Sequence, residues 1–211
     1  MKLYSYFRSS AAYRVRVALN LKGIAYETVP IHLTRDGGRQ NSAEFRAINP
    51  QMRVPVLVLD SGERLVQSLA IVDYLDHAFP APPMLPTEVV ARAKALSIAE
   101  IIACDIHPIN NLVTLNYLRG RLGHDQAAVD AWYAHWIVTG FEAIEAMIRP
   151  GPYAFGAEPS VADLCIVPQV YNARRYKVSL DRFPKIVGVD AACLKLEAFD
   201  RARPENQPDA E

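Results

Sequence analysis

Apolar and polar positions follow two different periods in the two parts of the chain. Over the first 80 residues, short apolar or aromatic runs end at turn residues, and this pattern predicts strands at 1–6, 25–33, 54–60 and 64–67. Apolar residues at three- and four-residue steps predict helices that begin at the serines Ser9/Ser10, Ser42 and Ser68. The resulting order β-α-β-α-β-β-α, with a parallel pair of strands and a closing hairpin, is typical of a small mixed α/β sheet domain.

Four prolines between Pro80 and Pro86 interrupt this pattern, and we expect a linker there. The predicted domains are therefore 1–80 and 87–211. Helical spacing dominates the second domain, with helices predicted over 89–122 (bent at Pro108), over 126–148, from Ser160, and over 184–199. Ser160 and Asp163 have the spacing of a capping box. The polar segment 203–211 is predicted to fray.

Composition narrows the class of protein. The 211 residues are 51% hydrophobic and 22% charged with a formal net charge of zero, which disfavours a nucleic-acid-binding protein. No apolar run reaches the roughly 20 residues of a membrane span, and no secretory pattern opens the chain. The cysteines Cys104, Cys165 and Cys193 are far apart and lack metal-ligand spacing. We therefore expect a cytoplasmic protein with reduced thiols, no metal and no membrane partner.

The turn before the first helix is a candidate anion site. Ser9 and Ser10 stand where a helix cap is expected, and the first helical N–H groups with the helix dipole favour a negative charge there. Arg8 adds a positive charge beside them. The ordinary structural alternative is that both serines are simple caps and Arg8 is a solvated charge.

Two further polar pairs stand at the ends of core elements. Val54-Pro55 precedes the third predicted strand, and Gln67-Ser68 opens a helix. If the first, third and fourth strands adjoin, these pairs meet the serine turn at one edge of the sheet. Main-chain groups at Val54 and a second helix N-terminus at Ser68 suit a peptide-like ligand.

Polar residues in the helical domain have both structural and functional interpretations. His107, Asn110 and Asn111 surround Pro108, where they could either satisfy freed backbone groups or line a cleft. Arg174 and Arg175 form either a solvated face or a site for anionic substrate groups. No Ser/His/Asp triad, P-loop or dinucleotide-binding glycine motif is present.

These stretches together resemble the zeta class of glutathione transferases, particularly its bacterial maleylacetoacetate isomerases. The resemblance covers about Met1 to Asp200 and rests on the segments Tyr6–Leu19, Asn49–Pro55, Gln67–Ile71, His107–Leu112 and Ala173–Tyr176. It implies an α/β plus all-α fold, with a thioredoxin-like N-terminal domain followed by a helical C-terminal domain, and it implies a homodimer. Ser160 and Asp163 match the family's capping box, a folding element.

The resemblance also implies a glutathione site. Pro55 would be cis, Val54 would pair with the cysteinyl part, and Gln67 and Ser68 would hold the γ-glutamyl end. The further matches are Gln40 as a glutathione contact, His107 and Asn111 as residues reaching the cleft, and Asn110 as a substrate contact. Many members of the class have a cysteine where this chain has Ala11, so side activities that need that thiol are in doubt.

The function implied is glutathione-dependent cis–trans isomerisation of maleylacetoacetate to fumarylacetoacetate in tyrosine and phenylalanine catabolism. A thiolate adds reversibly to the double bond of a small acidic substrate, which then rotates. Ser9 or Ser10 would promote ionisation of the thiol, while Arg8 and Arg175 (or Arg174) would hold acid groups and developing charge. The alternatives are maleylpyruvate isomerisation, a general glutathione transferase or dehalogenase activity, and a non-catalytic glutathione-binding module.

Overall fold

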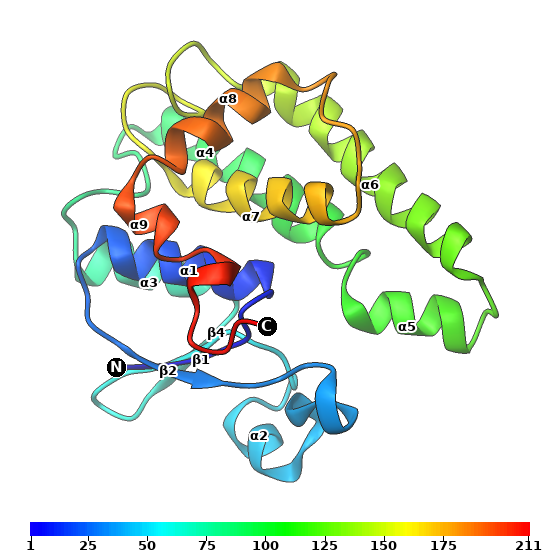
Figure 1. The fold of residues 1–211 in the computed structure, drawn as a ribbon. Coiled ribbons are helices and arrows are strands. Elements are labelled where there is room, and N and C mark those ends of the chain that lie inside the picture. The colour runs from blue at the N-terminus through cyan, green and yellow to red at the C-terminus, as the bar shows by residue number, and fades with distance from the viewer. The chain divides into compact units, whose positions relative to one another are not determined.

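A four-stranded sheet organises the first part of the chain in a computed structural model that describes residues 1–211 (Figure 1). Its strands, in the order β2-β1-β3-β4, are β1 (Lys2–Ser5), β2 (Glu27–Pro30), β3 (Val56–Val58) and β4 (Arg64–Val66). β1 pairs parallel with β2 and antiparallel with β3, and β3 pairs antiparallel with β4. The predicted parallel pair and closing hairpin are confirmed.

Helices α1 (Ser10–Leu21) and α3 (Ser68–Ala78) pack against each other on one side of this sheet (Figure 1). α1 is buried over most of its length because it is the crossover between the parallel strands β1 and β2. The short α2 (Ala43–Ile48) follows two 3₁₀ turns, η1 (Arg35–Gly37) and η2 (Arg39–Asn41). Its Phe45 joins the core near the start of β3.

The last residues of the chain belong to this same unit, which comprises Met1–Met84 and Leu194–Glu211. They contain α9 (Glu197–Asp200), which packs on α1, and the 3₁₀ turn η4 (Pro204–Asn206). The expected fraying of 203–211 is wrong. The Gln207 amide donates to two backbone carbonyls at 2.8 Å each, so internal hydrogen bonds order the segment. In the sequence analysis, residues 194–211 are instead assigned to the predicted helical domain 87–211.

The second unit, Leu85–Cys193, is helical. Its elements are α4 (Val89–Glu100), the π-helical turn η3 (Ile101–Ile106), α5 (Leu112–Gly120), α6 (Gln126–Met147), α7 (Val161–Arg175) and α8 (Pro184–Cys193). The chain does not bend at Pro108 but breaks there, because Asn111 caps a new helix. The predicted last helix is likewise divided into α8 and α9.

α7 is the most buried helix of this unit, and its predicted capping box is present. The Asp163 carboxylate is fully buried and accepts hydrogen bonds from the Ser160 N–H at 2.7 Å, the Ser160 hydroxyl at 2.9 Å and the Ala154 N–H at 2.8 Å. One side chain therefore fixes both the start of α7 and the loop before it. None of the helices is long and apolar enough to span a membrane.

Candidate active site

The turn that joins β1 to α1 places two serines at the helix N-terminus. Ser9 is the N-cap, and its Oγ accepts a hydrogen bond from the Ala12 N–H at 3.2 Å. This bond uses the oxygen as an acceptor and leaves the hydroxyl proton for donation. Ser10 is the first helical residue and is 8% exposed, whereas Ser9 is half-buried. No acidic side chain occupies the first turn of α1, so the positive end of its dipole is uncompensated there.

Arg8 is oriented by its neighbours and is only half-exposed. Its Nη2 and Nε donate to the Tyr6 hydroxyl at 2.9 and 3.3 Å, and its guanidinium carbon lies 5.0 Å from the centre of the Phe7 ring. These contacts reduce the freedom of the side chain. Arg8 is therefore positioned more firmly than a solvated surface charge.

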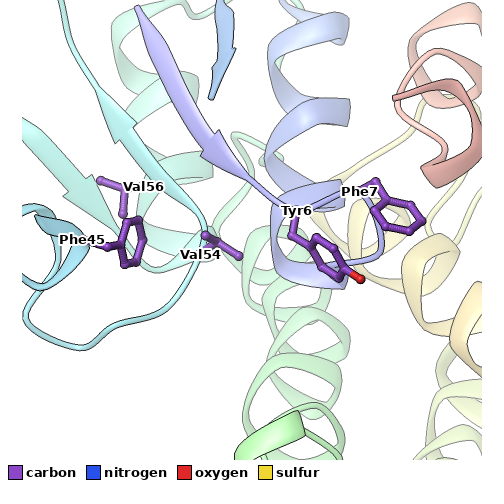
Figure 2. Close-up of a cluster of buried hydrophobic side chains, with 5 residues drawn as sticks. All are labelled: Tyr6, Phe7, Phe45, Val54 and Val56. Carbon is purple, nitrogen blue, oxygen red and sulfur yellow. The ribbon is translucent and has the colours of Figure 1, made fainter. Parts of the chain in front are cut away.

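Val54 lies in the apolar cluster that contains Tyr6, Phe7, Phe45 and Val56 (Figure 2). The Val54–Pro55 peptide bond is cis, as the family resemblance implies. Val54 is 8% exposed, yet its backbone N–H and C=O take part in none of the hydrogen bonds of the sheet, turns or caps. A main-chain donor and acceptor are thus left at this end of the sheet, before β3 begins.

Gln67 and Ser68 connect β4 to α3 in different ways. Gln67 has a φ of 68°, is exposed, and donates from Nε2 to Gln51 Oε1 at 2.8 Å. Positive φ is unusual for a residue with a side chain and is enriched at functional sites. Ser68 is buried, and its Oγ accepts a hydrogen bond from Arg14 Nη1 at 3.2 Å.

Gln40 stands in the loop between β2 and α2. Its Nε2 donates to the Leu33 carbonyl at 3.1 Å, while its Oε1 is buried without a hydrogen-bond partner. A Cβ at Gly38 would lie 2.5 Å from Gln40 Nε2, and Gly38 has a φ of 85°. The glycine is therefore required for the loop to pack closely against this amide.

The polar residues around Pro108 mainly satisfy backbone groups. Asn110 is 6% exposed and donates from Nδ2 to the Tyr133 carbonyl at 3.1 Å. The Asn111 side chain accepts from the Val113 N–H at 3.2 Å and so caps α5. His107 follows the π-helical turn and is half-buried. Both asparagines therefore bond to backbone groups, but these groups belong to α6 and to the first turn of α5 and are not ones that Pro108 frees. Asn110 Oδ1 is buried without a hydrogen-bond partner.

The two arginines at the end of α7 differ in their surroundings. Arg174 forms an ion pair with the buried Asp190, with 2.7 Å between Nη1 and Oδ2. The Arg175 guanidinium instead lies 4.5 Å from the centre of the Tyr176 ring, which stacks on Tyr133 at 3.5 Å between centroids. Burial raises the pKa of the Tyr133 hydroxyl, and the charge of Arg175 opposes that rise.

Within the first unit, the structure brings the serine turn and Val54 together, since Tyr6 belongs both to that turn and to the cluster around Val54. It also links α1 to Ser68 through Arg14, a residue that the sequence analysis did not single out. The missed signal is an arginine pair, Arg14 and Arg16, inside an otherwise apolar helix. Such charges need buried partners.

Comparisons with known proteins agree with this architecture. The family model for the N-terminal domain of glutathione S-transferase matches residues 3–83, and the model for its C-terminal domain matches residues 126–201. A probable maleylacetoacetate isomerase of Vibrio cholerae is 48% identical over 99% of this chain and 97% of its own length. A maleylpyruvate isomerase of a Ralstonia species is 46% identical over the full length of both.

Solved structures give the same result. A holo maleylpyruvate isomerase, described as a bacterial zeta-class glutathione S-transferase, matches with a TM-score of 0.96 and 45% identity over the whole of both chains. A Methylobacterium extorquens maleylacetoacetate isomerase with bound malonate and glutathione matches with a TM-score of 0.95 and 37% identity, again over both chains in full. The chain therefore belongs to the glutathione S-transferase family, and within it to the zeta class that contains the maleylacetoacetate and maleylpyruvate isomerases.

Proposed function

We propose that this chain is a glutathione-dependent cis–trans isomerase that converts maleylacetoacetate to fumarylacetoacetate. The observation that carries the proposal is the half-buried Ser9 hydroxyl, which caps α1 next to a turn that packs against Val54. Relatives that span the full chain bear this activity in their names, among them the enzyme of Pseudomonas aeruginosa at 44% identity. We further propose that the reaction belongs to tyrosine and phenylalanine catabolism.

The residues of the first unit fit glutathione. Val54 offers a backbone donor and acceptor that no other part of the chain uses, which suits pairing with a peptide. Gln40 contributes a buried Oε1 that lacks a partner. Gln67, exposed and held at positive φ, stands beside the N-terminus of α3, where a carboxylate is favoured. We propose that these residues, with Ser68, hold the tripeptide.

Between the two serines, the structure supports Ser9 as the residue that promotes ionisation of the thiol. Its oxygen accepts from Ala12, so its O–H is polarised and remains a donor toward a developing thiolate. The N-terminus of α1 adds favourable potential for negative charge. When bound, glutathione supplies the sulfur that adds to the double bond and departs after rotation.

The acidic groups of the substrate call for fixed positive charges. Arg8 is held by Tyr6 and is the candidate in the first unit. In the second unit, Arg174 is engaged by Asp190, so we propose Arg175 as the substrate-binding arginine. His107, Asn110 and Asn111 remain proposed contacts, although the two amides have structural partners. We further propose that the enzyme is a cytoplasmic homodimer.

Maleylpyruvate is the second candidate substrate. A Ralstonia maleylpyruvate isomerase is 46% identical over its full length, close to the 48% of the Vibrio relative. Identity alone therefore does not rank the two substrates, and we propose maleylacetoacetate because most of the named relatives act on it. We expect isomerisation to tolerate Ala11 at the position where many members of the class have a cysteine, since the reactive sulfur belongs to glutathione.

The test is direct. The purified protein is incubated with glutathione and either maleylacetoacetate or maleylpyruvate, and isomerisation is followed by absorbance. We expect turnover that requires glutathione and is faster with maleylacetoacetate. Binding of glutathione without turnover of either acid would favour the non-catalytic glutathione-binding module. Faster turnover of maleylpyruvate would make maleylpyruvate the preferred substrate and maleylacetoacetate the second candidate.

A further inference from the structure

The backbone of Phe7, two residues before Ser9, is held by charged side chains at both its N–H and its C=O, which belong to two successive peptide groups. Its N–H donates to Asp209 Oδ2 at 3.0 Å, and its C=O accepts from Arg16 Nη2 at 2.9 Å. Asp209 lies 202 positions away along the chain. The end of the polypeptide therefore contacts the backbone of the turn that carries the proposed thiol-activating serine.

Arg16 is the buried one of the two charged residues that contact the Phe7 backbone. It is fully buried, and its guanidinium donates to the Ser5 hydroxyl at 3.1 Å and to the carbonyls of Tyr6, Phe7 and Ala202 at 3.4, 2.9 and 3.0 Å. Burial lowers its pKa to about 10, so it stays charged at neutral pH, and the nearby Asp209 carboxylate opposes that lowering. The Tyr6 carbonyl also accepts from the Ser9 N–H at 2.9 Å. Arg16 thus reaches Ser9 through a shared acceptor.

Asp209 is supplied by an ordered segment. The Gln207 side chain donates to the carbonyls of Arg201 and Arg203, and Glu211 pairs with His32 and Arg35 at 2.6 and 2.8 Å. These contacts fasten the segment before and after Asp209. The second oxygen of Asp209, Oδ1, is buried and has no hydrogen-bond partner. The hydrogen bond from the Phe7 N–H is therefore the contact that the Asp209 carboxylate makes in this turn.

We infer that Asp209 is a positioning residue for Ser9, acting through the backbone of Phe7 and through Arg16. The carboxylate holds the N–H of the Tyr6–Phe7 peptide group, and the guanidinium holds the carbonyls of Tyr6 and Phe7. Together they fix two successive peptide groups, which sets the path of the turn and hence the direction of the Ser9 hydroxyl. Charge-assisted hydrogen bonds are stronger and shorter than neutral ones, so they are suited to this role. The inference rests on the proposed function, because it assigns Ser9 to activation of the glutathione thiol.

The first test uses protein without glutathione. Amide exchange of Phe7 and Ser9 is measured by NMR in the wild type, Asp209→Ala, Asp209→Asn and Glu205→Ala. Loss of a hydrogen bond to a charged group should speed exchange at Phe7 and Ser9 by about tenfold or more in Asp209→Ala. Asp209→Asn keeps an acceptor oxygen and should stay close to the wild type. Glu205→Ala is the matched control, since it removes an exposed carboxylate from the same segment without touching Phe7.

The second test uses the glutathione complex. The thiolate absorbance of bound glutathione and the pH profile of kcat/KM are recorded for the same variants. Asp209→Ala should raise the apparent pKa of the bound thiol by about 0.5–1 unit, with activity recovering at higher pH. A purely structural role would lower Tm and speed exchange at Phe7 while leaving both the pH profile and Ser9 exchange as in the wild type, and that result would overturn the inference. A wild type that does not isomerise refutes the proposed function separately, because the exchange measurement needs no ligand.

Discussion

Arg14 in α1 donates a hydrogen bond from Nη1 to the hydroxyl of Ser68, the first residue of α3, across 3.2 Å. Both residues are buried, with exposures of 2% and 5%. The bond fixes the start of α3 against α1 within the first unit, and the start of α3 is where we propose that the γ-glutamyl end of glutathione binds. The spacing between two proposed parts of the glutathione site is thereby set by a residue that does not itself belong to the site.

Replacing Arg14 by Met should weaken both stability and glutathione binding. The substitution keeps an extended apolar stem but leaves the buried Ser68 hydroxyl without this donor, at a cost of about 1–3 kcal/mol in the free energy of unfolding. Urea denaturation and calorimetric titration with glutathione measure the two effects. Unchanged stability together with unchanged affinity would show that the bond has no role in either.

Ser9→Ala should separate capping from chemistry. Loss of the cap should cost about 1 kcal/mol of stability, and loss of the donor should reduce kcat by about 10²–10³-fold. Ser42→Ala is the matched control, because Ser42 caps α2 by accepting from the Phe45 N–H at 3.1 Å. Its variant should lose a similar amount of stability and keep kcat. Equal turnover in the two variants would remove Ser9 from the mechanism.

Variants of the two arginines at the end of α7 should behave differently. Arg174→Ala removes the partner of Asp190 at one of its oxygens and should lower stability by about 1–2 kcal/mol, with little change in KM. Arg175→Ala should cost about 0.5–1 kcal/mol through loss of the guanidinium contact with the Tyr176 ring, and it should raise KM for the acidic substrate while the affinity for glutathione stays the same. Thermal melts and steady-state kinetics of both variants provide the comparison. A larger KM effect in Arg174→Ala would reverse the assignment.

Asp163→Ala should be the most destabilising of these substitutions. It deprives two backbone N–H groups and one hydroxyl of the acceptor that they share, in a fully buried position, and we expect a loss of about 3 kcal/mol or more. Asp163→Asn retains one acceptor oxygen and should lose less. The test is the unfolding midpoint in urea. A midpoint for Asp163→Ala equal to that of the wild type would contradict the importance of the capping box.

Local signals in the sequence predicted several features that the structure confirms. Ser9, Ser42 and the Ser160–Asp163 pair are caps as expected, because a cap is made by groups within about three residues of one another. The alternation of apolar runs with helical spacing predicted the order of strands and α-helices over residues 1–80, since each period specifies which face is buried. Ends were less well predicted: the expected strand 54–60 is only Val56–Val58.

Taken alone, the sequence determined the starts of the helices that follow serine caps, the pairing of the hairpin and the motifs that identify the family, but not the starts of α5 and α9. Only the tertiary structure decided that Arg14 and Arg16 are buried, that Asp209 reaches Phe7, and that Asp190 engages Arg174 rather than Arg175. The physical reason is separation along the chain. Arg14 and Ser68 are 54 residues apart and Phe7 and Asp209 are 202 apart, so packing of whole elements brings these charges to their partners.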